Sequence, residues 1–143
     1  MKTSNDVQAV IFKEDEVGLS FLVLERFDKE KNENHFRLVK GGIEDNEDAK
    51  NAIDREIAEE TGIDKIISKK NLPHYSYVGG KVKHEIDVFL VKVNPLSDIV
   101  VNSDQEGGFT IHRAIWMTGK EAIEKLTFKD EKELISIALK EIG

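Results

Sequence analysis

The chain contains no cysteine among its 143 residues, so disulfide bridges and cysteine-based zinc sites are excluded. It has only two prolines, and no apolar run approaches the roughly 18–20 residues needed to span a membrane. The first ten residues also lack the apolar segment of a secretory signal peptide. These absences predict a cytoplasmic protein with no membrane partner.

A surplus of basic residues is absent as well, because the formal net charge is −7 at pH 7. We therefore expect no binding to long nucleic acid. A small phosphorylated ligand could still bind through metal ions and a few local cations. The length predicts a single domain, residues 1–143, and the sequence leaves open a monomer or a homodimer. Apolar residues make up 39% and charged residues 34%, which suits a soluble globular fold.

The most informative segment is residues 41–63, which read GGIEDNEDAKNAIDREIAEETGI. If the segment is helical, Glu56, Glu59 and Glu60 share one face. Like charges at this spacing repel, each pair costing about 0.2–0.5 kcal/mol. A bound cation would offset the repulsion, and carboxylate oxygens suit Mg²⁺, with Mn²⁺ as the alternative. The competing interpretation is a solvated helix face without a ligand.

The same segment resembles the box of the Nudix (MutT-like) superfamily, G-x5-E-x7-R-E-U-x-E-E-x-G-U with U aliphatic. Every fixed position is filled, by Gly41, Glu47, Arg55, Glu56, Ile57, Glu59, Glu60, Gly62 and Ile63. The resemblance implies that the three glutamates bind divalent metal, joined by backbone carbonyls at Lys40 and Gly41. It also implies that Arg55 orients the glutamates and that Glu47 supports the site. The implied fold is an α/β/α sandwich with a mixed β-sheet.

Hydrophobic patterns predict the remaining elements. Strands are predicted at 8–12, 19–24, 35–39, 72–78, 82–93 and 111–117, and helices at about 48–61, from 118 and at 130–142. Ala49, Ile53 and Ile57 should form the buried stripe of the first helix, and Gly62 should end it. Thr118 begins a predicted capping box. The order of elements predicts an α+β or mixed α/β fold, with the acidic helix packed on a sheet.

The general base is predicted outside the box. In several Nudix members it lies on a loop before a strand that carries a tryptophan. The corresponding loop here precedes Trp116, and Glu106 is the first candidate and Asp104 the second. A box glutamate could serve instead, and a solvated loop carboxylate is the alternative for either loop residue.

Substrate contacts should also come from outside the box. Cations near strand ends are candidates for binding phosphate, namely Arg37, Lys40 and Lys83, with Lys81 and His84 as further possibilities. Segments around Tyr75, Tyr77 and Phe128 resemble the diadenosine tetraphosphate hydrolase group, in which an adenine stacks between aromatic side chains. The alternative for each of these residues is an ordinary surface or core position.

The resemblance implies a Mg²⁺-dependent hydrolase that cleaves a pyrophosphate bond in nucleoside diphosphate-linked substrates. The expected partner is a small nucleotide or another diphosphate, with dinucleoside polyphosphates such as diadenosine tetraphosphate as leading candidates. A (d)NTP pyrophosphatase, an RNA 5′ pyrophosphohydrolase and a diphosphoinositol phosphohydrolase are alternatives. A non-catalytic nucleotide-sensing module is an alternative of another class, although such modules usually lack box glutamates and this chain lacks none.

Overall fold

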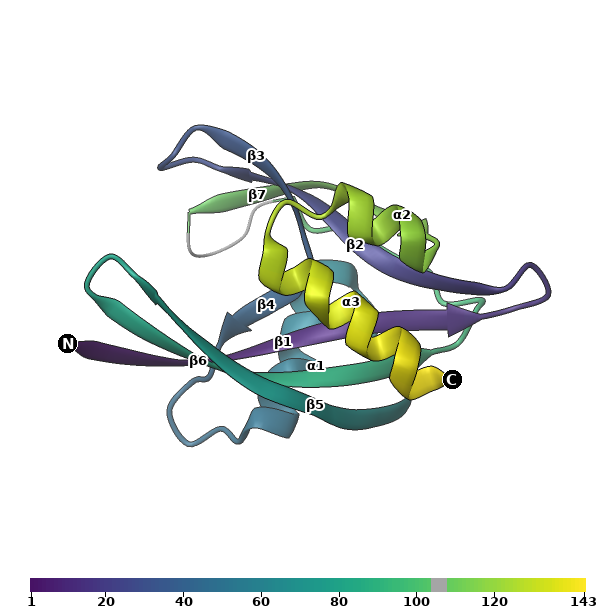
Figure 1. Cartoon of the computed structure of the whole chain (residues 1–143), viewed down its shortest axis with the longest axis horizontal. Helices are drawn as coiled ribbons and strands as arrows, with labels where there is room; N and C mark the ends of the chain where they lie inside the picture. The colour runs from purple at the N-terminus through teal and green to yellow at the C-terminus, as the bar shows by residue number, and fades with distance from the viewer. Residues whose placement is uncertain (104–107) are drawn as a thin grey trace.

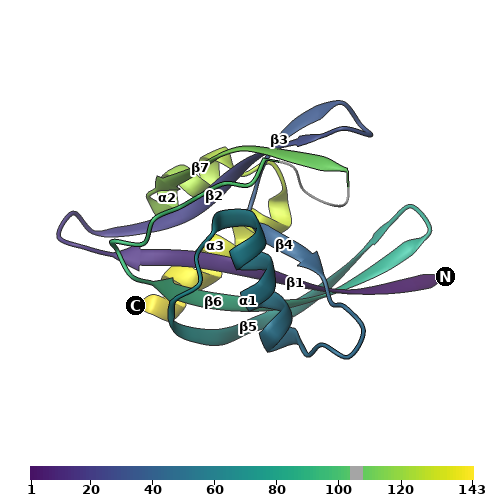
Figure 2. The same ribbon diagram turned by 180° about the vertical axis from the view of Figure 1, so that it is seen from behind.

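The computed structural model describes residues 1–103 and 108–143. In these residues seven strands form a mixed sheet, with α1 on one face and α2 and α3 on the other (Figure 1, Figure 2). The elements are β1 (Lys2–Glu14), β2 (Leu19–Asp28), β3 (Glu33–Arg37), β4 (Val39–Gly42), α1 (Ala49–Thr61), β5 (Ile66–Gly79), β6 (Val82–Val93), β7 (Phe109–Met117), α2 (Gly119–Lys125) and α3 (Lys129–Ile142). The predicted mixed α+β sandwich is confirmed.

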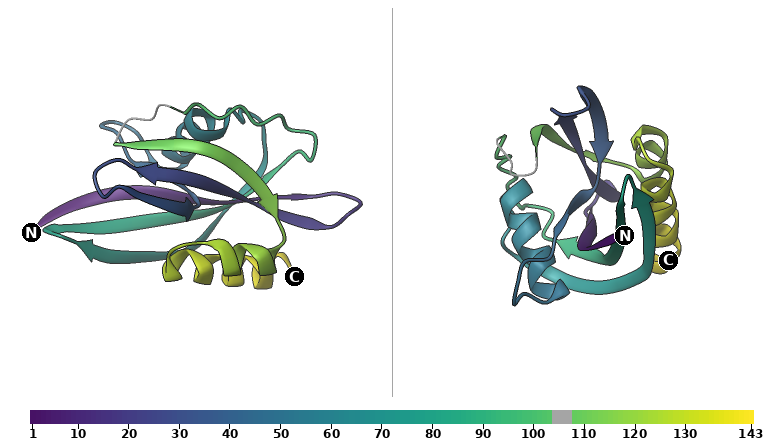
Figure 3. Two further views of the ribbon diagram at one scale, coloured as in Figure 1. Left: turned by 90° about the horizontal axis from the view of Figure 1, so that it is seen from above. Right: turned by 90° about the vertical axis from the view of Figure 1, so that its left-hand side faces the viewer.

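Strand β1 lies at the centre of the sheet. It pairs in parallel with β6 along residues 2–12, and in antiparallel fashion with β2 only at residues 12–14. Along residues 6–9 its second edge is taken by β4 instead. The strands β2, β3 and β7 therefore diverge from β1, β4, β5 and β6, as Figure 3 shows. Within the described residues β4 pairs with β1 alone, so its outer edge is unpaired.

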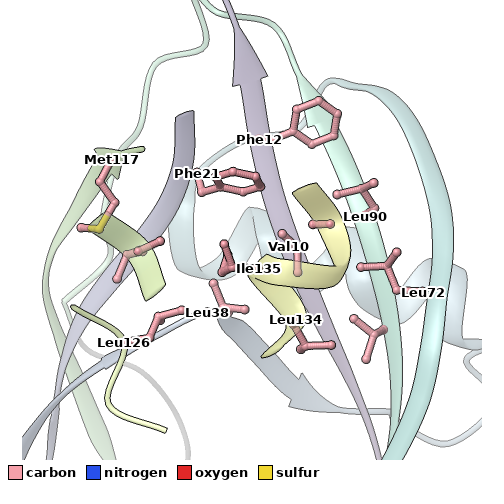
Figure 4. Packing of buried hydrophobic residues seen from close by; sticks show 14 of the residues in the cluster. Val10, Phe12, Phe21, Leu38, Leu72, Leu90, Met117, Leu126, Leu134 and Ile135 are labelled. Atoms are coloured by element: carbon pink, nitrogen blue, oxygen red, sulfur yellow. The ribbon is translucent and has the colours of Figure 1, made fainter. Parts of the chain in front are cut away.

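The alternation of side chains along β1 creates two cores. Ile11 faces α1 and belongs to the buried cluster that holds Ile53. Val10 faces α3 and belongs to the cluster that holds Leu134 and Ile135 (Figure 4). Any two neighbouring residues of β1 or β4 therefore reach opposite faces of the sheet, which decides where the functional side chains lie.

The ends of α1 follow the sequence signals. The side chain of Asp48 caps the helix by accepting a hydrogen bond of 2.8 Å from the backbone N–H of Asn51. Gly62 ends the helix in the left-handed region at φ 75°, as predicted. The predicted buried stripe needs one change, because Ala49 is only half-buried and Ala52 is fully buried. The capping box at Thr118 is confirmed.

Several strands are longer than their apolar runs, and the single strand predicted at 35–39 is in fact two, β3 and β4, which pair with different neighbours. Strand β1 extends to Lys2 rather than beginning at residue 8, because its polar end still pairs through the backbone with β6. Strand β5 begins at Ile66 rather than at residue 72, and its register shifts between Leu72 and Tyr75, at a proline on this edge strand. Helix α3 begins one residue earlier than predicted. None of the described helices combines the length and the apolar character needed to cross a bilayer.

Candidate active site

The carboxyl group of Glu56 lies against the end of β4. A methyl group placed on Gly41 would come within 2.0 Å of Cδ of Glu56, so only glycine leaves room for this carboxyl. Glu56 is 9% exposed. The first predicted metal ligand therefore touches the backbone that the sequence predicts to supply a metal-binding carbonyl.

Glu60 lies one turn further along α1 and is fully buried. Within the described residues, neither of its carboxylate oxygens accepts a hydrogen bond. Burial raises the pKa of Glu60 well above its ordinary value, the charge of Arg26 opposes this rise, and the adjacent Glu56 carboxyl adds to it. Burial also raises the pKa of Glu56, against the lowering effects of Glu60 and Arg55. A buried carboxyl without a donor, beside a second buried carboxyl, forms a site that favours a cation or a shared proton.

Arg26, a residue outside every predicted site, lies on β2 beside this pair. Its guanidinium carbon lies 3.5 Å from the ring centroid of Phe109 on β7, so the two side chains stack. Burial lowers the pKa of Arg26, and the charge of Glu60 opposes that change. The available signal was an arginine two positions after Leu24, because it keeps the side-chain alternation of the buried run and so points to the same face of the sheet as Leu24.

Arg55 joins the parts of the box. It donates to Glu47 through Nε at 2.8 Å and Nη2 at 2.9 Å, and to the carbonyl of Gly42 at 2.8 Å. Its Nη1 donates to Glu56 at 2.8 Å and to Glu59 at 3.3 Å. The bonds from Arg55 hold the pKa of Glu47 at about 2. One guanidinium thus ties the box loop, the end of β4 and two glutamates together, and the orienting role of Arg55 in catalysis stays a prediction.

Replacing Arg55 with lysine should lower kcat about 10- to 100-fold, the usual range for residues that orient metal ligands. Lysine keeps the positive charge but lacks the planar fork that reaches several acceptors at once. Steady-state kinetics would measure the effect. Full activity in Arg55→Lys would show that charge alone is sufficient.

Lys40 immediately precedes Gly41 but faces α3, on the opposite side of the sheet from Glu56. Its Nζ donates to the hydroxyl of Tyr77 at 2.5 Å and lies 3.8 Å from a carboxylate oxygen of Asp6. The ring of Tyr77 stacks on His84 with centroids 4.7 Å apart, and Nδ1 of His84 lies 2.8 Å from Asp6. Asp6 is only 6% exposed, so its buried carboxylate lies beneath Lys40 and His84 and holds both side chains in place.

Arg37 lies on the same face. Its Nε donates at 2.9 Å to Glu131 of α3, and its guanidinium carbon lies 4.4 Å from the ring centroid of Phe128. Burial, followed by the nearby charge of Glu131, raises the pKa of Tyr75, which keeps its hydroxyl protonated. That hydroxyl donates at 2.5 Å to the side-chain oxygen of Gln8. Five predicted substrate residues (Arg37, Lys40, Tyr75, Tyr77 and Phe128) therefore lie on one face of the sheet.

Other predicted contacts are placed differently. Lys83 projects toward the α1 side of β6, where its Nζ lies 3.1 Å from Glu85, so it does not join Arg37 and Lys40. The two candidates for the general base, Glu106 and Asp104, lie outside the described residues. Sequence reasoning also missed Glu131, Asp6 and Gln8. For Glu131 a sequence signal was available, because this acidic residue lies on the apolar face of the helix predicted at 130–142.

Comparisons with known proteins show the family to which this chain belongs. A family model described as the NUDIX domain matches residues 3–136. No curated protein matches the chain.

Among solved structures, Ap4A hydrolase from C. elegans, in a binary complex, is 18% identical and superposes with a TM-score of 0.77, covering 97% of this chain and 96% of that one. The MutT protein of Methanosarcina mazei is 19% identical, with a TM-score of 0.78 and coverage of 99% and 96%. The NUDIX domain of NrtR from Shewanella oneidensis, complexed with ADP ribose, is 15% identical, with a TM-score of 0.80 and coverage of 100% and 90%. At these identities the neighbours establish the fold alone.

Proposed function

Because the chain belongs to the Nudix family, a family of pyrophosphohydrolases, we propose that it is a Mg²⁺-dependent hydrolase of nucleoside diphosphate-linked substrates. Dinucleoside polyphosphates are the leading substrate class.

The observation that carries the proposal is the buried Glu60, whose two oxygens lack a donor in the described residues and which lies beside Glu56. Such a carboxylate costs free energy unless a cation or proton joins it. In the described residues no three acidic or histidine side chains converge as a ready metal cluster, and Glu59 is held by Arg55. The orphaned oxygens and the close contact at Gly41 nevertheless fit a divalent ion held by Glu56, Glu60 and a β4 carbonyl, with Glu59 as a further ligand.

Such an ion would act as a Lewis acid on phosphate oxygens and lower the pKa of bound water. The residues of the chain have other tasks. Arg55 fixes Glu56 and Glu59, and the buried setting of Glu60 excludes bulk water from its carboxylate. In the proposed reaction water attacks one phosphorus, and the bridging oxygen leaves with the other phosphate. The proton of the water goes to a general base, for which Glu106 remains the first prediction, with Asp104 or a box glutamate as alternatives.

The aromatic and basic side chains on the α3 face support a nucleotide substrate. Tyr75 and Tyr77 lie near each other with ring centroids 6.4 Å apart, and Phe128 is 38% exposed beside Arg37. A base can stack on such rings. Lys83 stays a predicted phosphate contact on the other face. These features favour a substrate that carries a base, which diphosphoinositol compounds lack.

A substrate panel tests the proposal. With Mg²⁺ the protein should cleave diadenosine or diguanosine tetraphosphate into a nucleoside triphosphate and monophosphate, with less action on simple triphosphates. EDTA should remove the activity, and Mg²⁺ or Mn²⁺ should restore it, because the carboxylates need the ion. Chromatography of the products measures both effects. Activity confined to triphosphates would mean that nucleoside triphosphates, and not dinucleoside polyphosphates, are the substrates. Activity that survives EDTA would contradict the metal dependence.

A further inference from the structure

Arg37 and Lys40, two of the cations on the α3 face, each lie beside a buried carboxylate. Arg37 pairs with Glu131, which is 1% exposed, and Lys40 lies near Asp6, which is 6% exposed. Each carboxylate offsets the charge of its cation, which weakens the attraction of Arg37 and Lys40 for a phosphate chain. This face suits an uncharged group that can stack and form hydrogen bonds, which in a nucleotide is the base.

Hydrogen-bond donors exceed acceptors in this cluster. In the described residues neither Nη1 nor Nη2 of Arg37 makes a hydrogen bond, and the fully buried side-chain nitrogen of Gln8 has no partner either. The acceptors of Glu131 and Gln8, in contrast, already receive hydrogen bonds from the protein. Glu131 receives Arg37 and the backbone N–H of Leu38, and Gln8 receives the Tyr75 hydroxyl through its oxygen. A ligand that matches this cluster must bring acceptors.

The contacts of Arg37 fix the orientation of its guanidinium and so restrict which acceptors can bind to it. Glu131 holds its Nε, and Phe128 covers one guanidinium face at 4.4 Å, so the terminal edge has a fixed orientation. That edge presents two parallel N–H groups, which fit two neighbouring acceptors. Guanine offers O6 and N7 in this arrangement, whereas adenine offers N7 beside the N6 amino donor. The two N–H groups of Arg37 therefore match both acceptors of guanine, but only N7 of adenine.

We propose that Arg37, held by Glu131 and Phe128, reads the base of the substrate and gives the protein a preference for guanine over adenine nucleotides. This inference rests on the proposed function, because it assigns the base recognised beside that catalytic site. Lys40 and Gly41 are neighbours on β4 and face opposite sides, so the base and the scissile phosphate lie on the two sides of one strand.

Kinetics with matched substrates test the preference. The value of kcat/KM for diguanosine tetraphosphate should exceed that for diadenosine tetraphosphate by about 10-fold or more, the discrimination expected of one bidentate arginine. The 7-deazaguanine analogue, which lacks N7, should lose most of this advantage. Equal or greater activity with the adenine substrate would overturn the proposal.

Arg37→Lys removes the fork but keeps a positive charge beside Glu131, so the buried carboxylate stays paired. This variant should lower the ratio of kcat/KM for the guanine substrate to kcat/KM for the adenine substrate to near 1, chiefly through a loss with the guanine substrate. Arg113→Lys is the matched control, because Arg113 also donates through Nε to a carboxylate, Glu25, but is largely exposed on β7. Equal losses on both bases in Arg37→Lys would assign Arg37 to phosphate and overturn base recognition.

Equilibrium binding separates this inference from the proposed reaction. Calorimetric titration with GMP and AMP needs no turnover, and it should show tighter binding of GMP in the wild type and a reduced difference in Arg37→Lys. Tight, selective GMP binding without hydrolysis would support the recognition site and reject the proposed function. Hydrolysis with equal affinity for GMP and AMP would support the function and reject the recognition site.

Discussion

Glu60→Gln is expected to lower kcat by at least about 1,000-fold, roughly 4 kcal/mol of transition-state stabilisation, while it raises the stability of the metal-free protein. The carboxylate is fully buried and its oxygens accept no hydrogen bond from the described residues. Glutamine has almost the same shape and no charge, so it removes a desolvation cost together with the proposed ligand. The free energy of unfolding should rise by about 1 kcal/mol, or roughly 3 °C in melting temperature.

The pH dependence of that gain has a definite sign. Burial raises the folded-state pKa of Glu60 above its unfolded value near 4.5, so the wild type is most favoured at acidic pH and loses stability as pH rises through the folded pKa. Residue 60 does not titrate in the variant. The stability advantage of Glu60→Gln should therefore be small below about pH 4.5 and grow toward neutrality.

Thermal melts in EDTA across this pH range, repeated with Mg²⁺, give the measurement. Mg²⁺ should stabilise the wild type and have little effect on Glu60→Gln, because binding to the folded state alone raises stability. A variant that melts at a lower temperature than the wild type at neutral pH would show that the buried Glu60 carboxylate does not destabilise the metal-free protein. Retained turnover would exclude Glu60 as a metal ligand.

Gly41→Ala is expected to reduce kcat about 100-fold, with a smaller effect on the melting temperature. The new methyl group would overlap the carboxyl of Glu56, which must then move by an ångström or more. Displacements of that size at a catalytic group cost about this factor. The backbone at Gly41 does not have a positive φ, so strain in the main chain is not the cause.

The neighbouring glycine supplies a matched control. A methyl group on Gly42 would meet nothing nearer than a carboxylate oxygen of Asp6 at 3.9 Å, which is ordinary contact. Gly42→Ala should therefore keep near-wild-type kcat. Comparable losses in both variants would mean that the loop backbone, and not the position of Glu56, limits activity.

The local parts of this site could be predicted from the sequence, because their signals lie within one helix and its caps. The box residues, the start of α1 at Asp48 and its end at Gly62 all depend on neighbours a few positions away. The contact between Glu56 and Gly41 depends on how the loop folds back, so the spacing alone could indicate the pair without its close packing.

Burial and pairing across the fold could not be predicted in this way. Glu60 is buried beside Arg26, and the ring that stacks on Arg26 comes from Phe109, a residue distant in the sequence. Likewise Glu131 is an acid on a helix that reads as amphipathic, and its partner Arg37 lies 94 positions earlier. Such pairs follow from which strands become neighbours, and a single sequence has no local signal for that.

The unpaired outer edge of β4 has a consequence for assembly. If the base binds on the α3 face and the scissile phosphate beside Glu56, the substrate passes the edge of β4, which must then stay open during turnover. A second chain that added a strand there would fill the passage with backbone hydrogen bonds. We therefore expect an active homodimer to be built on another edge, such as that of β5 or β7, and a peptide that extends the sheet at β4 to inhibit the protein.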